Sequence, residues 1–140
     1  MERIEDCISF LLGKAYQRVH QAAKRRLAPH GVTPVQYALL RVLWEREGQS
    51  GAELGERLQL DSATITGILD RLERAALVER RADPTDRRAQ RIFVTARGRA
   101  LQGPLDREMD DLNVEFLAAL APADAARLRA QLALLGRPGE

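Results

Sequence analysis

Cysteine, histidine and aromatic residues are scarce in this sequence, and each scarcity excludes a class of site. The single cysteine, Cys7, excludes an internal disulfide and a thiolate metal cluster. The two histidines, His20 and His30, lack metal-ligand spacing to carboxylates or to the cysteine, so we expect no metal. Aromatic residues make up only 4% of the chain, and the core must therefore be built from Leu, Ala, Val and Ile.

Long apolar runs and enzyme motifs are missing as well. No stretch approaches the roughly 18 residues of a membrane span, and the acidic N-terminus, MERIEDC, lacks the pattern of a secretory signal. The sequence holds neither a nucleophile elbow nor a phosphate-cradling glycine loop. These absences predict a cytoplasmic protein that is not an enzyme, needs no cofactor and has no membrane partner.

Charge is abundant but nearly balanced. The 140 residues, enough for a single domain over 1–140, include 22 basic and 20 acidic side chains. A formal net charge of +2 is too small to indicate a nucleic-acid partner by itself. Whether the protein binds nucleic acid must therefore be judged from the arrangement of the charges along the chain.

A long amphipathic helix is predicted within residues 4–29, where apolar side chains recur at steps of three to five. Pro29 and Gly31 end it. Thr33 and Pro34 are typical of an N-cap and a first helical residue, and they open a second helix.

Two short helices joined by a tight turn follow. Ser50 and Glu53 fit a capping box at the start of the first. Asp61 or Ser62 caps the second, and its predicted buried side is formed by Ile65, Ile68, Leu69 and Leu72.

A hairpin and two more helices complete the chain. Residues 77–81 and 91–94 are short, rich in Val and Ile, and separated by turn material, which predicts a hairpin, here called the wing. Thr95 caps a long helix that Pro104 must kink or shift, and Pro122 opens the last helix. The predicted fold is mainly α with a small β-hairpin wing, a winged helix-turn-helix.

The outward face of the helix capped by Asp61 or Ser62 is small and hydroxylated, then basic. Such a face suits a major groove. Small side chains allow the helix backbone to approach the DNA closely, hydroxyls form hydrogen bonds with phosphates or bases, and arginine forms two hydrogen bonds with one guanine. An ordinary amphipathic helix would look much the same. The outward and flanking residues are Ala63, Thr64, Thr66, Gly67, Asp70, Arg71 and Arg74.

The wing is rich in arginine. Nine arginines and no lysine lie from Arg71 to Arg99, and a basic hairpin beside such a helix reaches an adjacent minor groove. We expect Asp86, two residues before Arg88, to hold that side chain by a charge-assisted bond. A solvated turn is the alternative.

These segments together resemble the MarR family of bacterial transcription regulators. The resemblance implies a homodimer, joined by helices within 4–29 and 96–136, with a DNA-binding lobe over 33–95 that reads a pseudo-palindromic operator. The residues that carry it are Thr33-Pro34-Val35-Gln36-Tyr37, Leu60-Asp61-Ser62-Ala63-Thr64-Ile65-Thr66, Leu69-Asp70-Arg71-Leu72-Glu73, Asp83-Pro84-Thr85-Asp86-Arg87-Arg88, Phe93-Val94-Thr95 and Gly98.

By position, the resemblance also implies DNA-binding residues. Arg88 matches the minor-groove arginine of the family, Asp86 matches its partner, and Arg87 is expected on a phosphate. The residues expected at the major groove are Ser62, Thr64, Thr66, Gly67 and Arg71.

The resemblance further implies a repressor that a small aromatic acid, or its acyl-CoA form, releases from DNA. Arg41 or His20 is expected to meet a carboxylate; Tyr37 and Trp44 are alternatively core residues. The candidate ligand-binding residues are Phe10, Tyr16, His20, Tyr37, Arg41 and Trp44. The first helix also carries basic residues that either bind the phosphates of such a thioester or form a solvated face, namely Lys14, Arg18, Lys24, Arg25 and Arg26.

Two alternative functions stay open. The family's peroxide sensors place a cysteine directly before Phe-Leu-Leu, where this chain has Ser9. Cys7 lies two residues earlier, about 200° around a helix, so we expect a buried, inert thiol at the dimer joint instead of a redox sensor. A helical protein-interaction module without DNA binding would leave Arg87 and Arg88 unexplained.

Overall fold

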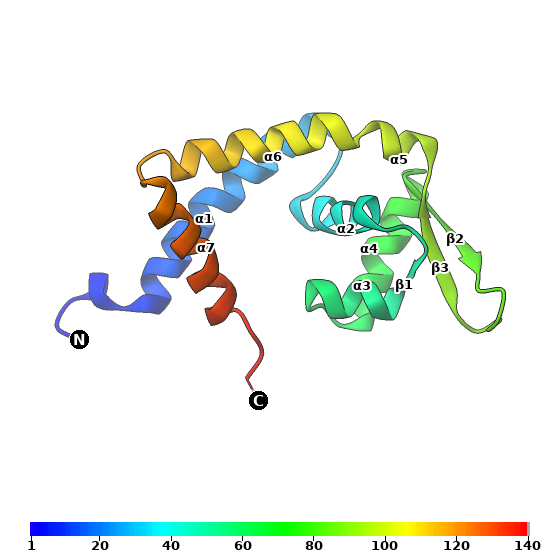
Figure 1. Ribbon diagram of the computed structural model, residues 1–140, viewed down its shortest axis with the longest axis horizontal. Coiled ribbons are helices and arrows are strands. Elements are labelled where there is room, and N and C mark those ends of the chain that lie inside the picture. Colours follow the sequence, from blue (N-terminus) through cyan, green and yellow to red (C-terminus); the bar gives the residue numbers. More distant parts are fainter. Residues whose placement is uncertain (140) are drawn as a thin grey trace.

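Two long helices extend away from a lobe of short helices and strands (Figure 1). The computed structural model describes residues 1–139. Helix α1 (Ile8–Leu27) runs beside α6 (Gln102–Leu117), and Ala22, Ala23 and Leu112 are buried between them. The mainly α fold with a small sheet agrees with the sequence prediction.

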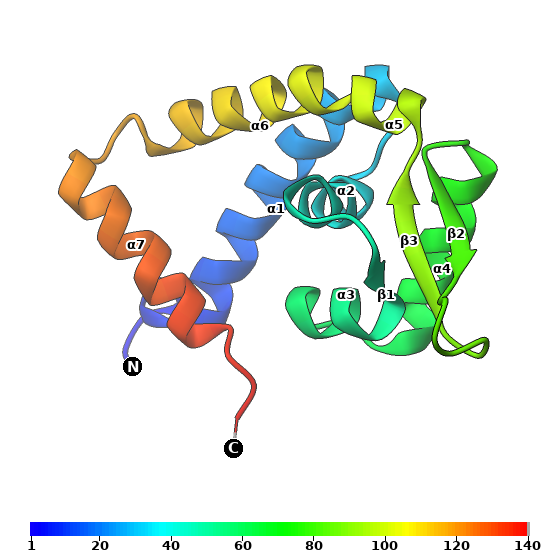
Figure 2. The same ribbon diagram turned by 45° about the vertical axis from the view of Figure 1, so that its right-hand side comes forward.

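The lobe has its own apolar core, and in it α4 lies behind the wing while two further helices lie beside the strands (Figure 2). Leucine, isoleucine and valine from the three helices and from the two hairpin strands are buried there, with no aromatic side chain among the fully buried ones of the described residues. The elements are α2 (Pro34–Glu45), β1 (Gln49–Ser50), α3 (Gly51–Leu58), α4 (Ser62–Arg74), β2 (Val78–Ala82) and β3 (Gln90–Val94).

Capping residues set the helix starts as the sequence predicts. The side chains of Thr33, Ser50, Asp61 and Thr95 each accept a hydrogen bond from the backbone N–H three residues on. The hydrogen bond from the Thr64 N–H, 2.7 Å long, lowers the pKa of Asp61.

The capping box expected at Ser50 is only half formed. Ser50 Oγ accepts from the Glu53 N–H at 3.1 Å. The Glu53 carboxylate turns outward and pairs with Arg46 at 2.8 Å. The cap therefore has one hydrogen bond instead of two.

The described residues form a three-stranded antiparallel sheet in the order β1-β3-β2. The hairpin register pairs Val78 with Val94 and Arg80 with Ile92. Strand β1 was not expected; its Gln49 pairs with Ile92 from the other side of β3. This pairing ties the wing to the start of α3.

The predicted helix after Thr95 is divided in two. Helix α5 (Ala96–Ala100) ends before Leu101, and α6 begins at Gln102 with Pro104 in its first turn. Proline there cannot donate to the carbonyl four residues earlier, so the helix restarts as expected. Helix α7 (Pro122–Leu135) then runs from Pro122 as predicted.

The first helix begins later than predicted. Residues Ile4–Asp6 form a separate 3-10 turn, and Cys7 is the extended N-cap of α1, with φ −82° and ψ 114°. The helical angle expected between Cys7 and Ser9 therefore does not apply. In the single chain the thiol is half-buried, and its burial at a dimer joint stays a prediction.

Apolar side chains are exposed on α1 and α7, two helices that Figure 1 shows away from the lobe. Ile8 of α1 is 60% exposed and Leu135 of α7 is 62% exposed. Leu11 and Leu132 on the same helices are also exposed. None of the helices in residues 1–139 is both long enough and apolar enough to cross a membrane.

Candidate nucleic-acid interface

Helix α4 separates its apolar and polar residues cleanly. Ile65, Ile68, Leu69 and Leu72 are buried, as the helical periodicity predicts. The outward side carries hydroxyl and arginine side chains, of which Ser62, Thr64, Thr66 and Arg71 are exposed and Gly67 is half-buried. The structure thus brings the five expected major-groove residues onto the accessible part of one helix.

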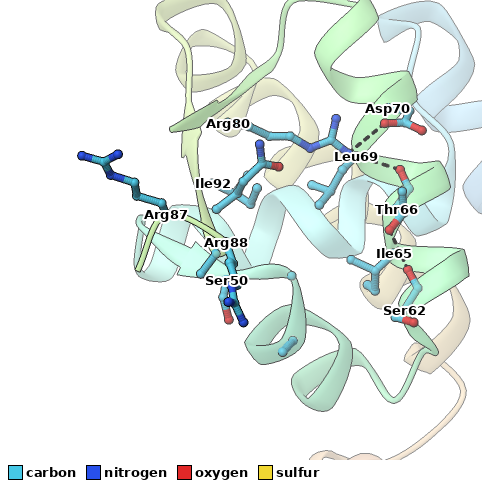
Figure 3. A pocket seen from close by; sticks show the side chains of 14 residues that line it. Ser50, Ser62, Ile65, Thr66, Leu69, Asp70, Arg80, Arg87, Arg88 and Ile92 are labelled. Atoms are coloured by element: carbon cyan, nitrogen blue, oxygen red, sulfur yellow. Dashed lines mark hydrogen bonds and ion pairs between the residues drawn. The ribbon is translucent and has the colours of Figure 1, made fainter. Parts of the chain in front are cut away.

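An open groove of about 640 Å³ lies between α4 and the wing (Figure 3). Ser62, Thr66 and Asp70 line it from α4, and Arg87 and Arg88 line it from the wing. The start of α3 closes the far side with Ser50, Gly51 and Ala52. The helix face and the basic turn, predicted separately from the sequence, are therefore two walls of one groove.

Asp83 organises the wing turn. Its carboxylate accepts hydrogen bonds from the Thr85 N–H and hydroxyl, both at 2.8 Å, and from Arg91 Nε at 2.9 Å. The Thr85 hydrogen bonds, followed by that of Arg91, hold the pKa of Asp83 far below its usual range. These hydrogen bonds fix the conformation of the turn. A turn that served only as a solvated connection between two strands would not need them.

Asp86 supports Arg88 differently from the prediction. Asp86 Oδ1 accepts from the backbone N–H of Arg88 at 3.0 Å. In the described residues no ion pair joins the Asp86 carboxylate to the Arg88 guanidinium. The short spacing favours the backbone contact, so Asp86 shapes the turn and leaves the Arg88 side chain free.

The two wing arginines point in different directions (Figure 3). The Arg88 side chain lies beside Ser50, whereas the end of the Arg87 side chain extends outward from the turn, away from α4. Both are exposed. Two guanidinium groups are thus available to a partner at different places along the turn.

Arg80 is a site residue that the sequence analysis did not single out. It comes from β2, and its Nη2 lies 2.8 Å from Asp70 Oδ1 on α4. Nothing in the arginine-rich sequence distinguishes Arg80 from Arg81. Only the inward direction of alternate strand residues, together with the hairpin register, could have identified it.

Three of the candidate ligand residues share one face of α2. Tyr37 Oη donates to Asp106 Oδ1 of α6 at 2.9 Å, and Arg41 Nη1 donates to Asp106 Oδ2 at 3.0 Å. Burial, and then the hydrogen bond to Asp106, raise the pKa of Tyr37. The Trp44 ring meets Tyr37 edge-on, and its indole N–H is buried without a partner in residues 1–139.

The other three candidates lie on α1. The rings of Tyr16 and His20 stack at 4.9 Å, and Lys14 Nζ lies 5.7 Å from the centre of the Phe10 ring. Tyr16 and His20 line an open hollow of about 720 Å³ together with the basic residues Lys14, Arg18 and Lys24. The single chain therefore holds the six candidates as two separate groups.

No group of three or more metal-binding side chains is found within residues 1–139. The polar side chains of the groove carry hydroxyls, guanidinium groups, the Gln90 amide and the Asp70 carboxylate. This set suits an extended anionic partner with hydrogen-bonding edges.

Comparison with known proteins agrees with this geometry. The MarR family model matches residues 32–89. The HTH-type transcriptional regulator TtmR of Methylorubrum extorquens is 41% identical over 105 residues, which are 75% of this chain and 54% of TtmR. The chain also spans 61% and 57% of two curated Bacillus subtilis regulators, so it covers less than two thirds of these relatives.

Solved structures match over nearly the whole chain. A probable transcriptional regulator from Pseudomonas aeruginosa is 34% identical with a TM-score of 0.87, and the match covers 95% of this chain and 99% of that one. CouR from Rhodococcus jostii, bound to p-coumaroyl-CoA, is 28% identical with a TM-score of 0.88, and the match covers 100% of this chain and 99% of CouR. CouR bound to a 23-mer DNA duplex also matches, with a TM-score of 0.84, 26% identity and coverage of 98% and 97%.

These matches include both the residues that form the groove and the long helices outside the lobe. The agreement in sequence and in fold with the Pseudomonas aeruginosa regulator covers both. The chain belongs to the MarR family.

Proposed function

We propose that this protein is a sequence-specific DNA-binding transcriptional regulator. The observation that carries the proposal is the groove in which the hydroxyl face of α4 and the arginines of the wing form adjoining walls. Helix α4 would enter a major groove with Ser62, Thr64, Thr66, Gly67 and Arg71 toward the DNA. We assign no catalytic residue.

The wing would contact the same duplex beside α4. Arg88 would enter the minor groove, since a guanidinium suits its narrow, negative environment. Arg87, whose guanidinium points away from α4 (Figure 3), would bind a phosphate, and Asp86 would hold the turn through the Arg88 N–H. CouR bound to duplex DNA supports this assignment by its similarity.

The regulator would act as a homodimer on a pseudo-palindromic operator. The exposed apolar residues at the ends of α1 and α7 support this, because such side chains gain by burial against a second copy. A two-fold dimer presents two copies of α4, so its half-sites should lie about one turn of DNA apart.

We further propose repression that a small aromatic carboxylate, or its CoA thioester, relieves. The donors on α2, Tyr37 and Arg41, and the unpartnered Trp44 indole N–H suit a carboxylate or carbonyl oxygen. The basic hollow beside Tyr16 and His20 suits phosphates. CouR bound to p-coumaroyl-CoA supports this ligand class by its similarity.

The test begins with a duplex selected by the wild-type protein from a random-sequence pool, called here the selected duplex. A duplex of the same composition in scrambled order is the control. We expect tight binding of the selected duplex, at least about 1,000-fold above the control, and a two-fold symmetric footprint. Equal binding of both duplexes would contradict the proposal and favour a protein-interaction module.

The ligand proposal is tested by adding p-coumaroyl-CoA or an aromatic acid to that complex. Release from the selected duplex at micromolar ligand supports it. The matched variant is Arg41→Gln, which removes a proposed anchor and should raise the ligand concentration needed for release. An unchanged response in Arg41→Gln would exclude Arg41 as the carboxylate partner.

A further inference from the structure

A single guanidinium joins the wing to α4. Arg80 Nη2 lies 2.8 Å from Asp70 Oδ1 and donates to the Thr66 carbonyl oxygen at 3.4 Å, and Nη1 lies 3.4 Å from Glu73 Oε1. Figure 3 shows the Arg80 side chain crossing from the strand to the helix. The three acceptors span two turns of α4, so Arg80 contacts the helix along its length and not at one point.

Arg80 is less exposed than the other ion-paired arginines of the described residues. Its side chain is 17% exposed, and its backbone pairs with the buried Ile92. Neighbouring Arg81 is 57% exposed, bonds Glu79 of its own strand and lies over the Phe93 ring. Adjacent strand residues face opposite sides, so only Arg80 holds α4.

We propose that Arg80 is a positioning residue that fixes the DNA-facing side of α4 relative to the wing. This inference rests on the proposed DNA-binding function. Thr66, whose carbonyl Arg80 contacts, carries an outward hydroxyl that donates to the Ser62 carbonyl at 2.8 Å. Arg80 thus acts on the turn of α4 that would approach the base edges.

Sequence readout needs this alignment because two elements must enter two grooves of one duplex together. A planar guanidinium with several donors fixes direction as well as distance, which an ammonium does not. A readout group displaced by a small rotation loses its directional hydrogen bonds, whereas general attraction to phosphates is barely affected. Loss of Arg80 should therefore reduce specificity more than overall attraction.

A second effect must be separated from positioning. Asp70 lines the groove and Glu73 is exposed further along α4, and without Arg80 their charges would repel phosphates. Arg80→Gln alone would therefore weaken binding for two reasons. The double variant Asp70→Asn/Arg80→Gln keeps the wild-type net charge and removes only the clamp.

The experiment compares binding of the selected and scrambled duplexes at several salt concentrations, with a thermal melt of each protein. In Asp70→Asn/Arg80→Gln we expect the ratio of the affinity for the selected duplex to that for the scrambled duplex to fall about tenfold or more. The affinity for the scrambled duplex and the salt dependence of binding should stay unchanged. Arg81→Gln, on the same strand, is the matched control and should keep the wild-type ratio. Arg80→Lys should give a ratio between those of the wild type and the double variant, because lysine keeps the charge but lacks the planar guanidinium.

The possible outcomes separate the two hypotheses. A wild-type ratio in the double variant would overturn positioning and leave charge neutralisation as the role of Arg80. A salt slope reduced by about one in the double variant would also overturn it, because Arg80 would then contact a phosphate directly. If the double variant is unfolded at the assay temperature, Arg80→Lys decides by the same ratio. Equal binding of both duplexes by wild-type protein would instead refute the proposed function.

Discussion

The Tyr37 hydroxyl donates to Asp106 Oδ1 at 2.9 Å, which joins the first helix of the lobe to the long helix α6. Arg41 donates to the other oxygen of the same carboxylate. One acidic side chain therefore holds two residues of α2. Helix α6 is one of the helices proposed to form the dimer, so Asp106 links these helices to the lobe.

Tyr37→Phe should lower the free energy of unfolding by about 1–2 kcal/mol, because it removes a part-buried hydrogen bond to a charged group. Urea denaturation measures this change. Tyr16→Phe is the matched control: Tyr16 is 65% exposed and should change stability by less than about 0.5 kcal/mol. Equal effects of the two substitutions would show that the Asp106 contact adds no stability.

The stability difference between wild type and Tyr37→Phe should also depend on pH. Burial and Asp106 raise the pKa of Tyr37 in the folded protein, so folding favours the neutral phenol. The benefit is complete below the unfolded pKa of tyrosine, about 10, and is lost as pH rises through the higher folded pKa. Urea denaturation of both proteins from neutral to strongly alkaline pH should show the difference shrinking; a constant difference would contradict the assignment.

Two glycines should respond to alanine in opposite ways. A Cβ at Gly98 would lie 2.2 Å from the Leu77 carbonyl oxygen and 2.7 Å from Val94 Cγ1, so Gly98→Ala should destabilise the fold by about 1–3 kcal/mol or more. A Cβ at Gly67 would meet open space, so Gly67→Ala should stabilise α4 by about 0.5–1 kcal/mol. Thermal and urea denaturation measure both.

Gly67→Ala also tests how close α4 comes to DNA. The added methyl should weaken binding of the selected duplex several-fold despite the stabler fold, because it occupies space at the proposed interface. Unchanged or tighter binding would place Gly67 away from the DNA.

The exposed apolar ends of α1 and α7 should govern association. Ile8→Glu places a charge on the proposed dimer surface and should convert a dimer to a monomer in analytical ultracentrifugation. Val35→Glu, at an exposed apolar position of the lobe, is the control and should remain dimeric. A wild-type protein that sediments as a monomer at micromolar concentration would contradict the dimer proposal.

Local signals in the sequence predicted much of this fold. The cap at Thr33 was predicted, and the cap of α4 was predicted to be Asp61 or Ser62, because a capping side chain acts on a backbone N–H only a few residues away. The buried side of α4 followed from helical periodicity, and the break near Pro104 from the missing N–H.

Interactions between distant segments could not be predicted in the same way. Strand β1 has two residues and depends on pairing with β3, more than 40 positions later. The partners of Arg80 and Asp106 depend on which long side chains face each other after packing. Composition shows that many arginines are present, but not which one is turned inward.

The most direct test of the DNA-binding account is the affinity of Arg71→Ala and Arg88→Ala for the selected duplex, measured by fluorescence anisotropy across a range of salt. Each substitution should cost about 1–3 kcal/mol, roughly tenfold or more in affinity, while melting remains close to wild type. Affinities equal to wild type for both variants at every salt concentration would contradict the account.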